Sequence, residues 1–237
     1  MEKSVNTIFV PLGMKAGLEK VVDVARRAGV PNSVEMIAAP SVSLGAASPH
    51  VIDLANAYAT FAAQGIYAKP FIINEVQGPN KGILYQGRIQ AQEVFRKDVM
   101  ADLTYALSRV TTSGTAAVVG SRVARPTAGK TGTSNDNASA WFNGYTPEVA
   151  ASVAFYRDDA TQSLNGIGGL TSVTGGSFPA RIWAEFVKGY LKNTPVQEFP
   201  APAYIGGTEP INLINAIPQM DPALIPPSPS PTPKKKK

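Results

Sequence analysis

The sequence has 237 residues, 44% hydrophobic and 16% charged, which suits one globular domain with a core, or one domain and a tail. There are no cysteines and one histidine, so disulfides, thiolate catalysis and His- or Cys-rich metal sites are excluded, and we expect no cofactor. The net charge is +5, but the last four residues are lysines; the remainder, at +1, is too nearly neutral to predict a nucleic-acid-binding surface.

The first half of the chain is predicted to be mostly helical. Apolar residues recur at helical spacing, and Gly29 with Pro31 ends the first helix. Ser48 followed by Pro49 is typical of a helix cap and a first helical position, so the second helix is predicted to begin there. The predicted elements are helices at 17–28 and 48–65, a hairpin of 71–76 with 83–86, and a long helix at 91–110.

The second half changes to a strand pattern. Apolar and small residues alternate between turns rich in Asn, Asp, Gly and Pro, which predicts a small antiparallel sheet and a closing helix. Eleven of the 20 prolines fall between Pro195 and Pro233, so we expect the folded region, residues 1–192, to be followed by a disordered tail at 193–237. The predicted elements are strands at 125–133, 140–145 and 148–156 and a helix at 178–191.

Gly129-Lys130-Thr131 resembles the end of a phosphate-binding loop, but its surroundings exclude that interpretation. The motif needs a glycine five positions before Gly129, where Ala124 stands. Pro126 removes a backbone donor from a loop that would have to present donors to phosphate. The following residues are typical of turns and do not open a helix, so the helix N-terminus that binds the anion is missing.

The alternative is a strand that carries Lys-Thr-Gly, the motif of penicillin-binding proteins and serine β-lactamases. A Ser-x-Asn companion, Ser4-Val5-Asn6, precedes it in the required order. The segments at 3–30, 40–65, 125–159 and 175–191 closely resemble the transpeptidase domain of class A penicillin-binding proteins, in the same order. The Pro-rich, Lys-ended tail is similar to those that follow this domain in actinobacterial members.

The resemblance implies a fold and an activity. The fold would be a mixed α/β (α+β) sandwich, in which helices pack on an antiparallel sheet. The intact protein would be a serine D,D-transpeptidase that cross-links peptidoglycan stem peptides and is acylated by β-lactam antibiotics. It would act at the extracytoplasmic face of the membrane or in the cell wall, although we expect neither signal peptide nor membrane anchor in this sequence.

The resemblance also implies roles for single residues. Ser4, Asn6 and Lys130 would be catalytic, and Thr131, Gly132 and Thr133 would bind substrate. Lys130 would place a positive charge near the substrate carboxylate, which the two threonine hydroxyls would bind. Gly132 would let the substrate backbone approach the strand edge. Ser4 would relay a proton to the leaving amine, Asn6 would hold an amide carbonyl, and the Thr133 amide would supply half of an oxyanion hole.

The nucleophile of that family stands in a Ser-x-x-Lys motif, and no serine of this chain has a lysine three positions later. We therefore expect the C-terminal part of a transpeptidase domain, inactive alone, with exposed apolar surface and with the preceding part of the domain as its partner. Two alternatives stay open: a non-catalytic module that binds peptidoglycan peptide or a β-lactam, and a related serine hydrolase such as a β-lactamase or esterase. Without the flanking resemblance, a polar turn or a helix cap is the better explanation of Ser4 and Asn6.

Overall fold

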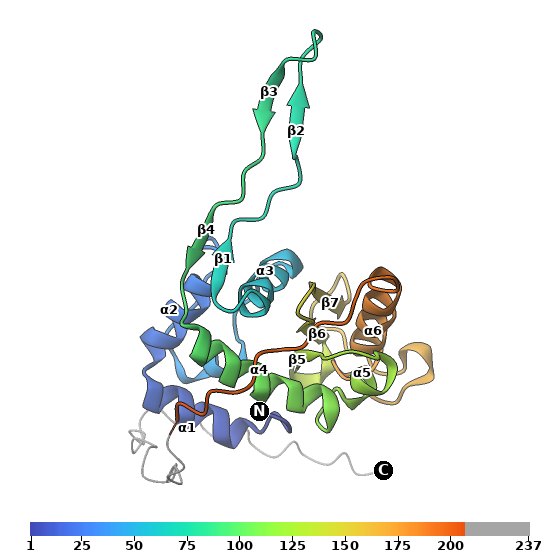
Figure 1. Cartoon of the computed structure of the whole chain (residues 1–237). Helices are drawn as coiled ribbons and strands as arrows, with labels where there is room; N and C mark the ends of the chain where they lie inside the picture. The colour runs from blue at the N-terminus through green and yellow to red at the C-terminus, as the bar shows by residue number, and fades with distance from the viewer. Residues whose placement is uncertain (207–237) are drawn as a thin grey trace, which may run out of the picture.

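The computed structural model describes residues 1–206, and its elements are shown in Figure 1. The longer helices are α1 (Asn6–Ala16), α2 (Leu18–Ala28), α3 (Val51–Ala62), α4 (Lys97–Thr112), α5 (Ala117–Arg122) and α6 (Phe178–Tyr190). Short 3-10 turns lie at Pro40–Leu44, Asn135–Asn137 and Ile167–Gly169. The strands are β1 (Ile66–Ala68), β2 (Glu75–Gln77), β3 (Ile83–Gln86), β4 (Ala91–Glu93), β5 (Ala128–Thr133), β6 (Ser139–Tyr145) and β7 (Ala150–Tyr156).

The centre of the fold is an antiparallel sheet in the order β5-β6-β7. One face packs against α5 and α6, where the rings of Phe142 and Trp183 meet edge to face with centroids 5.3 Å apart. On the other face Tyr145 contacts Tyr58 of α3 and shares a 2.9 Å hydrogen bond with Thr104 of α4. Both faces of the sheet are therefore covered by helices, and Figure 1 shows α3 and α6 on its opposite sides.

A helical lobe made of α1, α2 and α3 precedes the sheet. α2 and α3 are joined by the Thr60 hydroxyl, which donates to the carbonyl of Ala28 at 2.8 Å within a small buried cluster. The Arg26 guanidinium donates to backbone carbonyls of the loop that follows α2 and so ties this loop to its helix. The lobe contacts the sheet through α3.

Several predicted elements are confirmed, and several of the predicted boundaries are wrong. The helix at 17–28, the hairpin, the three sheet strands and the closing helix all form, although the first hairpin strand is 75–77 instead of 71–76 and the first sheet strand begins at Ala128 instead of Arg125. The predicted helix at 91–110 is wrong in its first part, because residues 91–93 pair as β4 with β1 and the helix begins only at Lys97. The predicted start at Ser48 is also wrong: α3 begins at Val51, and the Asp53 carboxylate accepts the backbone N–H of His50 at 2.9 Å.

The prediction of a disordered tail from residue 193 is wrong for residues 193–206, which pack along the domain as an extended strap. Arg125, buried with Glu148, donates to the carbonyl of Thr194 at 3.1 Å. Phe199 lies 5.5 Å from the Tyr145 ring, and the Asp102 carboxylate accepts two successive backbone N–H groups from the end of the strap. These contacts offset the entropy cost of ordering the segment. The proline content of the sequence does not predict them. The remaining part of the predicted tail, 207–237, lies outside the described residues.

The hairpin of β2 and β3 extends away from the rest of the fold (Figure 1). Its apolar side chains are exposed, Ile72 by 98% of its surface, which agrees with the prediction of exposed apolar surface. Within residues 1–206 we find no helix with both the length and the apolar content needed to cross a bilayer.

Candidate functional site

The two sequence motifs meet at one point. Lys130 lies in the third position of β5, and its ammonium donates hydrogen bonds to Ser4 Oγ at 2.5 Å and to the Thr131 carbonyl at 2.8 Å. Ser4 and Lys130 are separated by 126 positions in the chain. Burial lowers the pKa of Lys130 from 10.5 to about 8, because partial loss of hydration destabilises the charged ammonium more than the neutral amine. This lysine can therefore exchange a proton near neutral pH.

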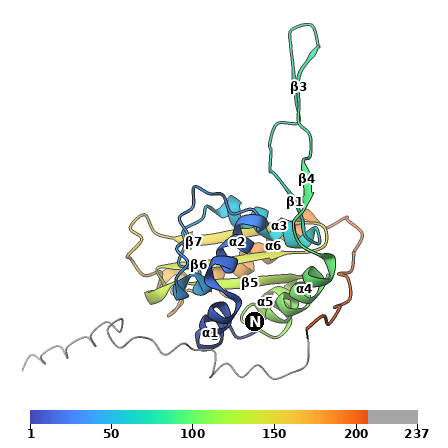
Figure 2. The same cartoon turned by 90° about the vertical axis from the view of Figure 1, so that its left-hand side faces the viewer.

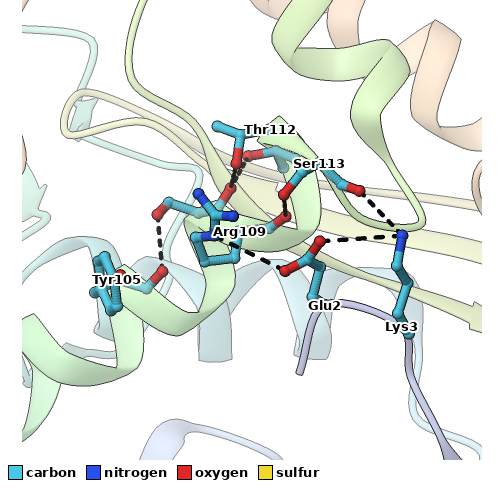
Figure 3. Close-up of polar contacts among 8 residues, drawn as sticks. Glu2, Lys3, Tyr105, Arg109, Thr112 and Ser113 are labelled. Carbon is cyan, nitrogen blue, oxygen red and sulfur yellow. Dashed lines mark hydrogen bonds and ion pairs between the residues drawn. The ribbon is translucent and has the colours of Figure 1, made fainter.

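Ser4 is held by contacts that the residues before it make with the end of α4 (Figure 3). The Glu2 carboxylate lies 3.8 Å from Arg109, and the Lys3 ammonium donates to the Ser113 carbonyl at 3.3 Å. The backbone N–H of Thr115 donates to the Glu2 carbonyl at 3.2 Å. Ser4 itself has a φ of 53°, in the left-handed region that is uncommon for residues other than glycine. The local backbone thus takes an unfavourable conformation that places the serine hydroxyl against Lys130.

The threonines on either side of Gly132 have partners within the protein. The hydroxyls of Thr131 and Thr115 are hydrogen-bonded at 2.7 Å, and Thr115 is itself exposed. Thr133 Oγ1 accepts the backbone N–H of Gly175 at 3.1 Å. An accepting hydroxyl keeps its own proton free, so Thr133 can still donate to an anionic group.

β5 is an edge strand among the described residues, because it pairs only with β6. At Gly132 an added Cβ would lie 3.3 Å from Cβ of Trp141, a close approach that favours glycine. An edge strand with unpaired backbone groups can take up an extended peptide as a further strand. The edge of β5 carries Lys130 and both threonines, so such a peptide would lie beside them.

Asn6 is the one predicted site residue that these contacts do not include. It is the exposed first residue of α1, and its side chain makes no hydrogen bond among residues 1–206. The structure thus brings Ser4 to Lys130, while the predicted role of Asn6 stays a prediction. Thr115 was missed, since a Ser-Gly-Thr sequence after a helix carries no signal beyond that of a turn. The described chain has no group of three or more His, Cys, Asp or Glu placed to bind a metal ion.

A family model of the penicillin binding protein transpeptidase domain matches residues 1–165 of the chain. The chain belongs to this family. Its Ser-x-Asn and Lys-Thr-Gly residues both lie within the matched range, and their roles in a site stay predictions. The predicted family and fold class are therefore confirmed, with mycobacterial proteins among the relatives.

Curated relatives of the family include two mycobacterial proteins. Penicillin-binding protein 1A of Mycolicibacterium smegmatis is 31% identical over 98% of this chain and 31% of its own length. Penicillin-binding protein 1A of Mycobacterium tuberculosis is 29% identical over 87% of this chain and 28% of its own. The chain therefore spans about a third of the length of the curated relatives that it matches.

Solved structures show the same fold. The PonA1 protein from Mycobacterium tuberculosis, in complex with penicillin V, is 28% identical and superposes with a TM-score of 0.67, covering 76% of this chain and 52% of that one. Penicillin-binding protein 1A from Haemophilus influenzae superposes with a TM-score of 0.73 over 84% of this chain and 35% of that one. At 21% identity, the second likeness concerns the fold alone.

Proposed function

We propose that this chain supplies the Ser-x-Asn and Lys-Thr-Gly part of a peptidoglycan cross-linking serine D,D-transpeptidase, which is also the target of β-lactam antibiotics. The observation that carries the proposal is the 2.5 Å hydrogen bond from Lys130 Nζ to Ser4 Oγ. Two motifs expected to act together, but distant in the sequence, are in contact. Membership of the family supports the same reaction class.

The proposed chemistry follows from the two groups. A serine nucleophile attacks the penultimate D-Ala carbonyl, and the leaving D-Ala amine needs a proton. Ser4 Oγ can donate its own proton to that amine while it takes another from the Lys130 ammonium, so the hydroxyl acts as a relay. Because the pKa of Lys130 is about 8, this second transfer costs little near neutral pH.

Substrate binding would use the free edge of β5. An extended stem peptide would pair with the strand, and its terminal carboxylate would lie beside the Lys130 ammonium and the Thr133 hydroxyl. The backbone N–H of Thr133 would stabilise the oxyanion together with an N–H at the nucleophile. A β-lactam carries a carboxylate and a strained amide in a comparable arrangement, and so would occupy the same place.

The nucleophile is the group that this sequence does not supply, because no Ser-x-x-Lys is present. We propose that the preceding part of the same domain supplies it in the intact protein, at the extracytoplasmic face of the membrane or in the cell wall. The other partners would be peptidoglycan stem peptides and β-lactams.

Intact mass spectrometry after incubation with a reactive penicillin tests the proposal. The 237-residue chain alone should gain no adduct, and a longer form that includes an upstream Ser-x-x-Lys segment should gain one penicillin per chain. In that longer form, Lys130→Ala should slow acylation by about 100-fold or more.

Three results would contradict the proposal. A stoichiometric adduct on the 237-residue chain would show that a serine within it, Ser4 first among them, is the nucleophile. Saturable penicillin binding without an adduct in the longer form would favour a non-catalytic binding module. Turnover of the bound penicillin at a rate comparable to its acylation would favour a β-lactamase.

A further inference from the structure

A polar row crosses the sheet beside Lys130. The strand register places Lys130 opposite Asn143 of β6, and Asn143 opposite Ser152 of β7. Residues directly opposite each other in antiparallel strands project from the same face, so the three side chains share one face. Tyr145, two positions after Asn143 and therefore on that face, contacts α3. The row lies in the part of the sheet that α3 helps to cover.

The row contains buried polar atoms without partners. Asn143 is 7% exposed, and neither its Oδ1 nor the Oγ of Ser152 has a hydrogen-bond partner among the described residues. A buried acceptor without a partner costs free energy, and native proteins rarely keep one. A valine at position 143 would avoid this cost and would suit a strand better. The carboxamide therefore requires an explanation.

The strand register places the Lys130 side chain on the same face as this acceptor. An ammonium has three N–H groups, and two of them are used by Ser4 and by the Thr131 carbonyl. One donor is left over on β5, and one buried acceptor is left over at the directly opposed position on β6. Two charged side chains of α4 have other partners: Arg109 pairs with Glu2, and the Asp102 carboxylate accepts from the strap backbone.

We propose that Asn143 is a positioning residue for Lys130, and that its carboxamide oxygen takes the third ammonium N–H directly or through one buried water. Buried waters in proteins typically bridge polar groups that otherwise lack partners. Asn143 would restrict the ammonium to the side of the strand where Ser4 lies. It would touch neither substrate nor nucleophile, and would act through Lys130 alone.

The test is the titration of Lys130 followed by NMR of lysine side chains labelled with ¹³C and ¹⁵N, with the signal assigned by its loss in Lys130→Met. In the unsubstituted chain the pKa of Lys130 should be about 8. Asn143→Val should lower this midpoint, because the charged form loses an acceptor. Asn143→Asp should raise it. Ser152→Ala is the matched control, since it removes the other unpartnered atom of the row and should leave the midpoint unchanged.

The direction of the shift in Asn143→Val separates positioning from a merely structural role. A loosened fold would hydrate Lys130 and move the midpoint upward, toward the 10.5 of a free lysine. An unchanged midpoint together with a raised melting temperature would overturn the proposal, because Asn143 would then be only an unsatisfied core residue.

A crystal structure of the unsubstituted chain is the second measurement, in case Asn143→Val fails to fold. It should show Lys130 Nζ joined to Asn143 Oδ1 directly or through one water, and the absence of both links would overturn the proposal. The contact of Asn143 with Lys130 does not depend on the proposed function. Only the importance of this contact for catalysis rests on that function. Neither measurement uses a penicillin or a peptide, so its failure can be told apart from failure of the proposed function.

Discussion

At the scale of single residues, the pKa of Lys130 makes stability depend on pH. The folded pKa, about 8, lies below the 10.5 of an unfolded chain, so the unfolded state binds more protons between these values. Burial of the charged Lys130 therefore lowers the free energy of unfolding by its full amount below about pH 8. This loss of stability disappears as the pH rises toward 10.5. The shift corresponds to roughly 3 kcal/mol, or about 2 kcal/mol allowing for the part of the side chain that water reaches.

The corresponding prediction compares Lys130→Met with the unsubstituted chain by chemical denaturation at pH 7 and pH 10. Methionine has no proton to lose, so the stability of the unsubstituted chain should gain about 2 kcal/mol relative to the variant between these pH values. Every other titratable group is common to both proteins, so its contribution cancels in the difference. Parallel stability profiles would show that Lys130 is hydrated and has an ordinary pKa.

Gly175 gives a prediction at a backbone contact beside the site. A Cβ added there would lie 2.1 Å from the Trp141 carbonyl oxygen and 2.6 Å from that of Gly132, and neither backbone atom can move aside easily. Gly175→Ala should therefore displace the loop from β5, break the hydrogen bond to Thr133 and cost about 1–3 kcal/mol of unfolding free energy.

Gly189→Ala is the control for this substitution. Gly189 lies in α6, and nothing lies within 4 Å of the added Cβ, so alanine should stabilise the helix by up to about 1 kcal/mol. Urea denaturation of both variants checks the pair. Equal effects in the two would contradict the close packing of Gly175 against the sheet.

At the scale of elements, hydrophobic periodicity predicted those helices and strands whose formation depends on neighbouring residues in the sequence. The helix at 17–28 and the alternation in β7 were read correctly, because periodicity reports which face is buried. Residues 91–93 were misread because their pairing with β1 is made across more than twenty positions of sequence, which no window of periodicity contains. The contact of Ser4 with Lys130 followed from motif order, whereas Thr115 and Asn143 are visible only once the strands are placed.

The strap provides the element-scale prediction. Phe199 is half-buried against Tyr145 in the described part of the Pro-rich segment, whereas Val196, three positions earlier, is 54% exposed. Phe199→Ala should lower the unfolding free energy by about 1–3 kcal/mol, below the cost for a fully buried ring. Val196→Ala should change it by less than about 0.5 kcal/mol. Thermal unfolding of both variants decides, and a negligible effect of Phe199→Ala would show that the strap does not stabilise the domain.

At the scale of the whole molecule, exposed apolar surface is concentrated on the projecting hairpin. The residues concerned are Phe71, Ile72, Ile73, Val76, Ile83, Leu84, Tyr85 and Ile89. A two-stranded ribbon of this kind has little stability of its own, and β2 and β3 pair only with each other (Figures 1 and 2). We call residues 69–90, which include β2 and β3, the ribbon. The ribbon should therefore expose apolar surface to solvent without stabilising the domain.

Removing the ribbon tests this division of roles. Ala68 and Ala91 are directly paired at the base of the hairpin, so a two-residue Asn-Gly turn can replace residues 69–90. The shortened chain should keep its unfolding free energy within about 0.5 kcal/mol and should bind much less of an apolar dye. Dye binding that persists would place the accessible apolar surface on the helical lobe instead, where Val5, Ile8 and Leu12 of the first residues are also exposed. Loss of cooperative unfolding would show that the ribbon is part of the folding unit, since a dispensable element cannot remove the transition.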